Sequence, residues 1–325
     1  MDRARARAHA LGLLLAAVGA VALAAAAGDP PIRGMRWAAR DADPVATFGR
    51  TPPECLTLPR DPAAALSVEL GRAAFRTPVL LGGQAARAGL ACDTCHKAGR
   101  RNPSFLFPGV SGGPGTADVT SSLFSTHRGD GVDNPKPIPD LGGAKAALKV
   151  DQAPASRRLE HFIHGLVTEE FDGAEPPKAV LDGLANYVRA LSPGGCPAAA
   201  SEPVTVGYYL SDARRAVAAA RGEIAAGDGP SAILALASAR SRLGLIDERF
   251  AGARLTAERA AVRAADRRLA LAQDGVRAHR GEVPAELTAW LARSRALEAK
   301  LSAKASLSLF DPGRLAQASR RRLPA

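Results

Sequence analysis

Cys92-Asp93-Thr94-Cys95-His96 is the stretch on which the interpretation of the rest of the sequence depends. It is a C-x-x-C-H run, the spacing typical of covalent haem attachment. Two thiols three positions apart can each add to one vinyl group of a haem and form thioethers. The imidazole of His96 can then reach the iron as an axial ligand. The sequence therefore predicts one haem c, bound at Cys92, Cys95 and His96.

Two other uses of paired cysteines fit this stretch less well. A redox-active C-x-x-C pair is expected between a strand and a helix in a βαβ unit, whereas Gly, Ala and Arg flank Cys92. A structural zinc site needs two further ligands close by, and the remaining cysteines, Cys55 and Cys196, each stand alone. Covalent haem remains the preferred interpretation.

The N-terminus predicts export. Arg3, Arg5 and Arg7 precede the apolar run 11–27, which ends in small residues, so residues 1–27 have the pattern of a secretory signal peptide. An uncleaved membrane anchor is the alternative, because the run is close to the shortest length that spans a bilayer. We expect the rest of the chain to lie in the periplasm, where nucleic acid is an improbable partner.

Export also predicts a disulfide. In an oxidising compartment, two spare cysteines are most simply bonded to each other. Cys55 and Cys196 stand on either side of the C-x-x-C-H run. We therefore expect a Cys55–Cys196 bridge, with two unrelated buried thiols as the alternative.

Charge divides the chain after the leader into two parts. Residues 28–200 carry 19 Lys and Arg against 18 Asp and Glu, whereas residues 201–325 carry 21 against 13. The basic excess of the second part fits docking to an acidic redox partner protein or to anionic lipid at a membrane surface. The simpler interpretation is the solvated face of an Arg-rich helical domain.

Apolar spacing predicts a chain made largely of helices. In the first part, helical periodicity covers 64–76, 156–166 and 177–191. The Pro-rich segment 28–65 is expected to wrap around these helices as coil, and the Gly-, Pro- and Asp-rich segment 102–150 to form a long irregular loop. This Asp-rich loop also permits, without demanding, a calcium ion.

The tail, residues 201–325, is expected to be helical throughout. Ser211-Asp212 and Ser231 are candidate N-caps, and Leu255, Val262, Leu269 and Val276 recur every seven residues as in a coiled coil. A bundle of three antiparallel helices is the most economical packing for these stripes. Trp290 is expected in its core.

The ligand on the second face of the haem iron determines the chemistry, because an open face admits peroxide whereas a protein ligand favours electron transfer. His127, in the long loop, is the preferred candidate. His164 on the predicted helix 156–166, an open or water-bound face, and Met35 remain as alternatives.

Residues of about 66–191 resemble one domain of the bacterial di-haem cytochrome c peroxidase and MauG superfamily. The matching motifs are Leu70–Phe75, Cys92–His96, Arg101–Pro103, His127–Gly131, Phe162–Gly165, Glu170–Gly173 and Leu184–Leu191. The resemblance implies a cytochrome c-like haem domain and places Thr126-His127 near the position of the family's ligand loop. Those peroxidases use two haems, whereas this chain has one C-x-x-C-H run, so the resemblance implies a mono-haem relative.

The sequence thus predicts an all-α protein with a signal peptide (1–27), a cytochrome c-like haem domain (28–200) and an antiparallel helical domain (201–325). Its predicted function is single-electron transfer as a periplasmic cytochrome, with no catalytic residues. The alternative is a peroxidase-like enzyme with an open haem face, in which Arg128, Asp130, Glu169 and Glu170 supply acid, base or charge-stabilising groups. A haem-bearing scaffold or sensor is a third class.

Overall fold

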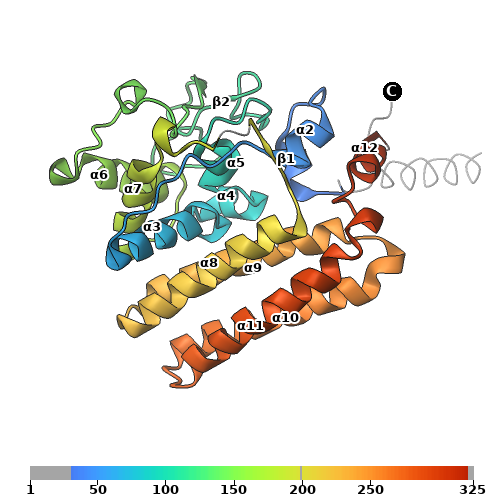
Figure 1. Ribbon diagram of the computed structural model, residues 1–325. Coiled ribbons are helices and arrows are strands. Elements are labelled where there is room, and N and C mark those ends of the chain that lie inside the picture. Colours follow the sequence, from blue (N-terminus) through green and yellow to red (C-terminus); the bar gives the residue numbers. More distant parts are fainter. Residues whose placement is uncertain (1–30, 198–199, 321–325) are drawn as a thin grey trace, which may run out of the picture.

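A computed structural model describes residues 31–197 and 200–320 (Figure 1). The predicted signal peptide, residues 1–27, lies outside this range. The described chain is mostly helical, as predicted, and its strands are only two residues long. Within these residues, no helix combines the length and the apolar character that crossing a bilayer requires.

The N-terminal module, residues 31–197, surrounds the C-x-x-C-H run with short helices and irregular chain. Its α-helices are α2 (Pro44–Phe48), α3 (Pro62–Phe75), α4 (Gly83–Ala88), α5 (Cys92–Cys95), α6 (Arg158–Gly165) and α7 (Lys178–Ala190). One turn of 3-10 helix, η1 (Arg33–Trp37), begins the module, and a π-helical turn, η6 (Leu166–Glu170), follows α6. The predicted helices at 64–76, 156–166 and 177–191 correspond to α3, α6 and α7.

Most of the segment 102–150 is irregular, as its composition predicted. Its only strands are β2 (Thr116–Ala117) and β3 (Lys136–Pro137), which pair antiparallel. A second antiparallel pair joins β1 (Arg50–Thr51) of the Pro-rich wrap to β4 (Glu202–Pro203), at the start of the tail.

Helices α3 and α7 cross at a glycine contact. A Cβ atom placed on Gly71 of α3 would lie 1.9 Å from the carbonyl oxygen of Gly183 in α7. Only two glycines allow the backbones to approach this closely. The apolar faces on either side of the crossing, which include Phe75 and Leu184, are buried.

The tail, residues 200–320, contains four long helices rather than the expected three. These are α8 (Val206–Ala225), α9 (Gly229–Arg249), α10 (Thr256–Arg277) and α11 (Val283–Ser302), followed by the shorter α12 (Pro312–Arg320). Helix α8 packs on α9 and α11, and α10 packs on the same two. The prediction of three was wrong because the chain also breaks at 250–255, after α9, so the heptad stripe Leu255–Val276 belongs to a separate helix, α10.

The predicted N-caps of the first two tail helices were also wrong. Thr205 caps α8 by accepting a hydrogen bond from the Tyr208 amide at 3.0 Å, and Asp228 caps α9 by accepting one from the Ser231 amide. Asp212 is instead the seventh residue of α8 and is buried. Its position there brings a carboxylate to the junction with the N-terminal module.

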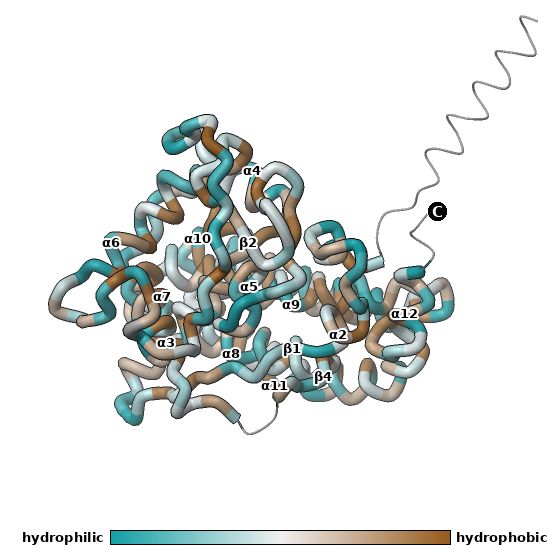
Figure 2. The backbone as a smooth tube through the Cα atoms, turned by 90° about the horizontal axis from the view of Figure 1, so that it is seen from above, coloured by the Kyte–Doolittle hydropathy of each residue, from teal (hydrophilic) through white to brown (hydrophobic). Residues whose placement is uncertain are grey.

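The N-terminal module and the tail share one hydrophobic core. Helix α3 packs on α8 and α9 as well as on α7, and one continuous buried cluster extends from Val68 and Leu184 to Leu236 and Leu287. Figure 1 shows α8 and α9 between the module and the outer pair α10 and α11. At the other end of the molecule, α12 lies beside α2 in both views (Figure 2), where Leu315 packs on Met35.

Candidate haem-attachment site

The C-x-x-C-H run forms a single, tightly hydrogen-bonded turn. The left-handed Gly89 (φ +75°) ends α4 and redirects the chain into α5. The Thr94 hydroxyl accepts a hydrogen bond from the Ala91 amide at 3.0 Å, and the His96 amide donates to the Cys92 carbonyl at 2.8 Å. Cys92 and Cys95 are free thiols three residues apart on this turn, so both can reach one edge of a bound group.

The imidazole of His96 is oriented through one of its two ring nitrogens. Its Nδ1 lies 3.0 Å from the carbonyl oxygen of Pro139. A carbonyl oxygen only accepts hydrogen bonds, so Nδ1 carries the proton and Nε2 keeps the lone pair that can bind a metal. Burial also lowers the pKa of His96 to about 4, so the ring is neutral near pH 7.

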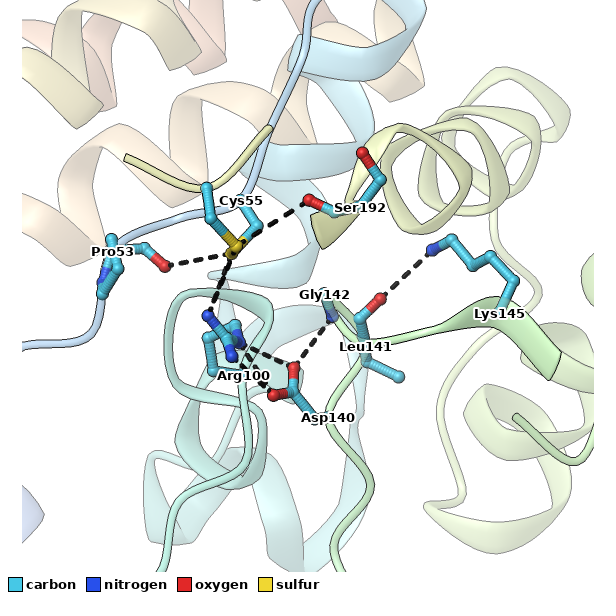
Figure 3. The surroundings of a disulfide bond; sticks show 9 residues. Pro53, Cys55, Arg100, Asp140, Leu141, Gly142, Lys145 and Ser192 are labelled. Carbon is cyan, nitrogen blue, oxygen red and sulfur yellow. Dashed lines mark hydrogen bonds and ion pairs between the residues drawn. A yellow bond between two sulfur atoms is a disulfide. The ribbon is translucent and has the colours of Figure 1, made fainter. Parts of the chain in front are cut away.

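The loop that supplies the Pro139 carbonyl is held in place by an ion pair and by contacts near the disulfide. Arg100 binds the Asp140 carboxylate through Nε at 2.7 Å, and the Gly142 amide donates to the Gly99 carbonyl at 3.1 Å. The predicted Cys55–Cys196 disulfide is confirmed, and the Arg100 guanidinium also contacts Cys55 Sγ at 2.9 Å (Figure 3). Segments before and after the attachment turn are thereby tied to it.

Aromatic side chains from four separate segments meet near the two thiols. Trp37 stacks on Phe107 with ring centroids 4.2 Å apart, Phe107 meets Phe124 at 5.0 Å, and Phe124 meets Phe171 at 5.4 Å. Cys92 and Cys95 pack against the buried cluster to which these rings belong. An apolar, aromatic surface of this kind suits a flat, largely apolar ligand.

The donor set fits covalent haem better than a redox disulfide or zinc. Burial raises the pKa of both thiols to about 12, the reverse of the lowered pKa of a redox-active or metal-binding cysteine. The part of the chain that the structure describes contains no cluster of three His, Cys, Asp or Glu side chains that could hold a metal ion. Two protonated thiols, one neutral imidazole and an apolar surround match the requirements of a haem c.

The preferred candidate for the second axial ligand, His127, lies on an exposed loop. Its side chain is 63% exposed, and its Nδ1 lies 3.1 Å from the Asp172 carboxylate, which leaves Nε2 free as in His96. The loop is held to the segment after α6, because Thr126 also donates hydrogen bonds to Asp172.

The alternative ligands have other contacts. His164 Nε2 lies 2.8 Å from the Glu175 carboxylate. Met35 is buried against Leu315 of α12 and serves as part of a small apolar core. His164 therefore has its Nε2 engaged, whereas His127 has its Nδ1 engaged, and Met35 belongs to an apolar core.

The residues considered for acid–base chemistry are engaged in local contacts. Arg128 Nε donates to the Glu169 carboxylate at 2.8 Å, and its Nη1 lies 3.8 Å from the Glu170 carboxylate. Asp130 accepts a hydrogen bond from the Val132 amide at 2.8 Å. In the loop considered for calcium, Asp118 accepts hydrogen bonds from the amides of Thr120 and Asn134.

Comparisons with known protein families, with curated proteins and with solved structures found no match for this chain. Its function is therefore argued from the residues themselves.

The sequence analysis missed Pro139, Trp37, Phe107 and Phe124. The role of Pro139 rests on a main-chain oxygen, which has no signature in the sequence. The aromatic residues come from segments that showed no periodicity. The one feature of the sequence that could have drawn attention to them is that aromatic residues are rare in this chain, at 4% of its residues.

Proposed function

We propose that this chain is an exported mono-haem c-type cytochrome that transfers single electrons. In this proposal residues 31–197 form a cytochrome c-like haem domain, related to one domain of the di-haem peroxidase superfamily. The proposal rests on one observation above all: His96 Nδ1 is engaged by the Pro139 carbonyl, while Cys92 and Cys95 are free on the same turn. That combination leaves available the three atoms that covalent haem attachment uses.

Each part of the site has a task in this proposal. Cys92 and Cys95 hold the group covalently, and a haem bound there supplies an iron that gains and loses one electron. The Pro139 carbonyl keeps the His96 ring in one tautomer and one orientation, which strengthens its Nε2 as a donor. The aromatic rings exclude water from the site, and a drier site changes the reduction potential.

The charge of the tail supports a partner of opposite sign. Many arginines of α10 and α11 are exposed, among them Arg267, Arg268, Arg293 and Arg295. An acidic redox protein is the partner that we propose, and contact with an anionic membrane surface is the alternative source of negative charge.

The experiment is expression with export and haem maturation, followed by intact mass and optical and EPR spectra of the purified ferric protein. We expect one covalent haem per chain and a low-spin signal that peroxide does not change. A colourless protein with the mass of the bare chain would refute the proposal. A Cys92→Ser, Cys95→Ser double variant is the matched control and should carry no covalent haem.

The same spectra test the peroxidase-like alternative. A high-spin ferric signal that reacts with peroxide would favour the enzyme over the electron carrier. The pairing of Arg128 with Glu169 supports the carrier, because a carboxylate held by a guanidinium is a poor proton acceptor.

A further inference from the structure

Asp93, which stands between the two attachment cysteines, holds the chain that follows His96. Its side chain is 18% exposed, and its Oδ1 accepts a hydrogen bond from the Ala98 amide at 2.9 Å. Ala98 is buried and has a left-handed backbone (φ +52°), which a residue other than glycine rarely adopts unless its surroundings hold it there. The carboxylate of Asp93 therefore fixes the main chain on the far side of His96, within the same turn.

Two arginines form ion pairs with this carboxylate. Arg76 Nε lies 3.7 Å from Asp93 Oδ1, and Arg242 Nη1 lies 3.7 Å from Asp93 Oδ2. Arg76 also binds the carboxylates of Glu54 and Asp212, at 2.8 and 2.6 Å. Within residues 31–197 and 200–320, Arg242 forms an ion pair with Asp93 alone. Asp93 is thus the counterion of Arg242, whereas Arg76 has two closer ones.

Arg242 joins the tail to the attachment turn. It belongs to α9 and is 6% exposed, and its Nη2 donates to the main-chain oxygen of Arg76, the residue that ends α3. This contact satisfies one of the carbonyl groups that the end of a helix leaves unpaired. Because burial and this hydrogen bond hold the guanidinium in one position, a positive charge of the tail is fixed beside Asp93.

These two charges lie in or beside the turn that carries His96, so they act on any charge at its imidazole. Electrostatic interactions need no contact, and they extend over about 10 Å even between exposed groups at 0.1 M salt. Burial weakens this screening further. A carboxylate near His96 favours additional positive charge on a metal ion bound there, and a guanidinium disfavours it.

We propose that Asp93 of the attachment turn and Arg242 of the tail set the reduction potential of a haem bound at His96 in opposite directions. Asp93 stabilises the ferric form, which carries one more positive charge than the ferrous form, and so lowers the potential. Arg242 destabilises the ferric form and raises the potential. This inference rests on the proposed function, and it gives the tail a part in the redox site through a charge rather than through a ligand.

The test is a redox titration of the purified haem protein, in which the titrating reductant supplies the one electron that reduction adds. Asp93→Asn removes the charge but keeps an oxygen that can accept from the Ala98 amide. It should favour reduction about tenfold, which is about 59 mV for a one-electron couple. Arg242→Gln should disfavour reduction by a similar factor. Both variants should keep the optical spectrum of the unaltered protein, because neither change removes an iron ligand.

Arg240→Gln is the matched control for Arg242→Gln. It also removes a positive charge from α9, but Arg240 points to α10, where its Nε donates to the Asp266 carboxylate at 2.8 Å. Its potential should equal that of the unaltered protein. Arg242→Lys keeps the charge and should shift the potential less than Arg242→Gln does. If Arg242→Gln does not fold, Asp93→Asn decides the question, because its predicted shift has a definite sign.

Shifts in the same direction for Asp93→Asn and Arg242→Gln would show a loosened turn rather than an effect of charge, and would overturn the proposal. Equal potentials in a protein that carries one covalent haem would overturn this inference alone. A chain that carries no covalent haem would overturn the proposed function and this inference together.

Discussion

The guanidinium of Arg76, the residue that caps the C-terminus of α3, and the carboxylate of Asp212 in α8 lie 2.6 Å apart, where the N-terminal module meets the tail. Both side chains are 3% exposed. Burial alone would raise the pKa of Asp212, but the charges of Arg76 and then Arg72 hold it well below its usual range. The unfolded chain therefore takes up a proton on Asp212 at a higher pH than the folded chain does, near pH 4.

The first prediction concerns this ion pair. Its contribution to stability is fully present above about pH 4 and decreases as the pH falls further. At pH 7, Asp212→Asn should lower the free energy of unfolding by about 3–5 kcal/mol, because it leaves buried guanidinium charge uncompensated. Urea unfolding at pH 7 and pH 3 measures both effects, and the variant should lose less stability on acidification. Asp274→Asn, at an exposed pair with Arg277, is the control; an equal loss there would contradict the prediction.

The second prediction concerns the crossing of α3 and α7. Gly71→Ala should lower stability by about 1–3 kcal/mol or more, because the new methyl group would overlap the Gly183 carbonyl and force the helices apart. Gly244→Ala in α9 is the matched control, since no atom lies within 4 Å of its added methyl. That change should be neutral or stabilising, because alanine favours a helix. Thermal unfolding of both variants measures the difference, and similar melting temperatures would argue against a tight crossing.

A third prediction concerns the Cys55–Cys196 bridge, whose residues are 141 positions apart in the sequence. Replacing both cysteines by serine should cost about 4–5 kcal/mol, the chain-entropy value for so long a closed loop. Chemical reduction of the unaltered protein should produce the same loss in urea unfolding, because thioether bonds resist reductants. If reduction destabilised the double variant just as much, a different bond would be responsible.

The fourth prediction concerns the second axial ligand of the haem iron. If His127 supplies it, His127→Ala should convert a low-spin ferric EPR signal to a high-spin one and open the iron to peroxide. His161→Ala should leave the spectrum unchanged, since His161 is an exposed residue of α6. An unaltered spectrum in His127→Ala would remove His127 from consideration, and His164→Ala would then be the next variant.

Local patterns predicted much of this structure. Apolar spacing was sufficient for α3, α6 and α7. Helices α3 and α7 bury their apolar side chains in the main core, and α6 buries Leu159 against α7 in a small separate cluster. Gly, Pro and Asp correctly predicted an irregular segment at 102–150, and the two cysteines outside the C-x-x-C-H run predicted the disulfide. The helices and the irregular segment depend on residues that are close in the sequence. The disulfide could be predicted because only two cysteines remained to bond to each other.

Long-range contacts account for what the sequence did not predict. Asp212 has the residue type of a helix cap, yet it serves as a buried counterion because α3 brings two arginines to it. The apolar spacing of the tail could not reveal that the stretch after Ser231 forms two helices, α9 and α10, rather than one. The Pro139 carbonyl reaches His96 across 43 residues through a main-chain atom, which the side-chain pattern does not report.

The single buried cluster that runs from α3 through α8 and α9 has a consequence for how this molecule can be divided. If residues 31–197 were expressed alone, Val68 and its apolar neighbours would be exposed to water. We expect such a fragment to aggregate rather than to fold by itself. Heat or urea should melt the surroundings of the thiols and the distal helices in one step. The tail therefore cannot be removed without destabilising the N-terminal module, and natural selection on either part acts on the stability of both.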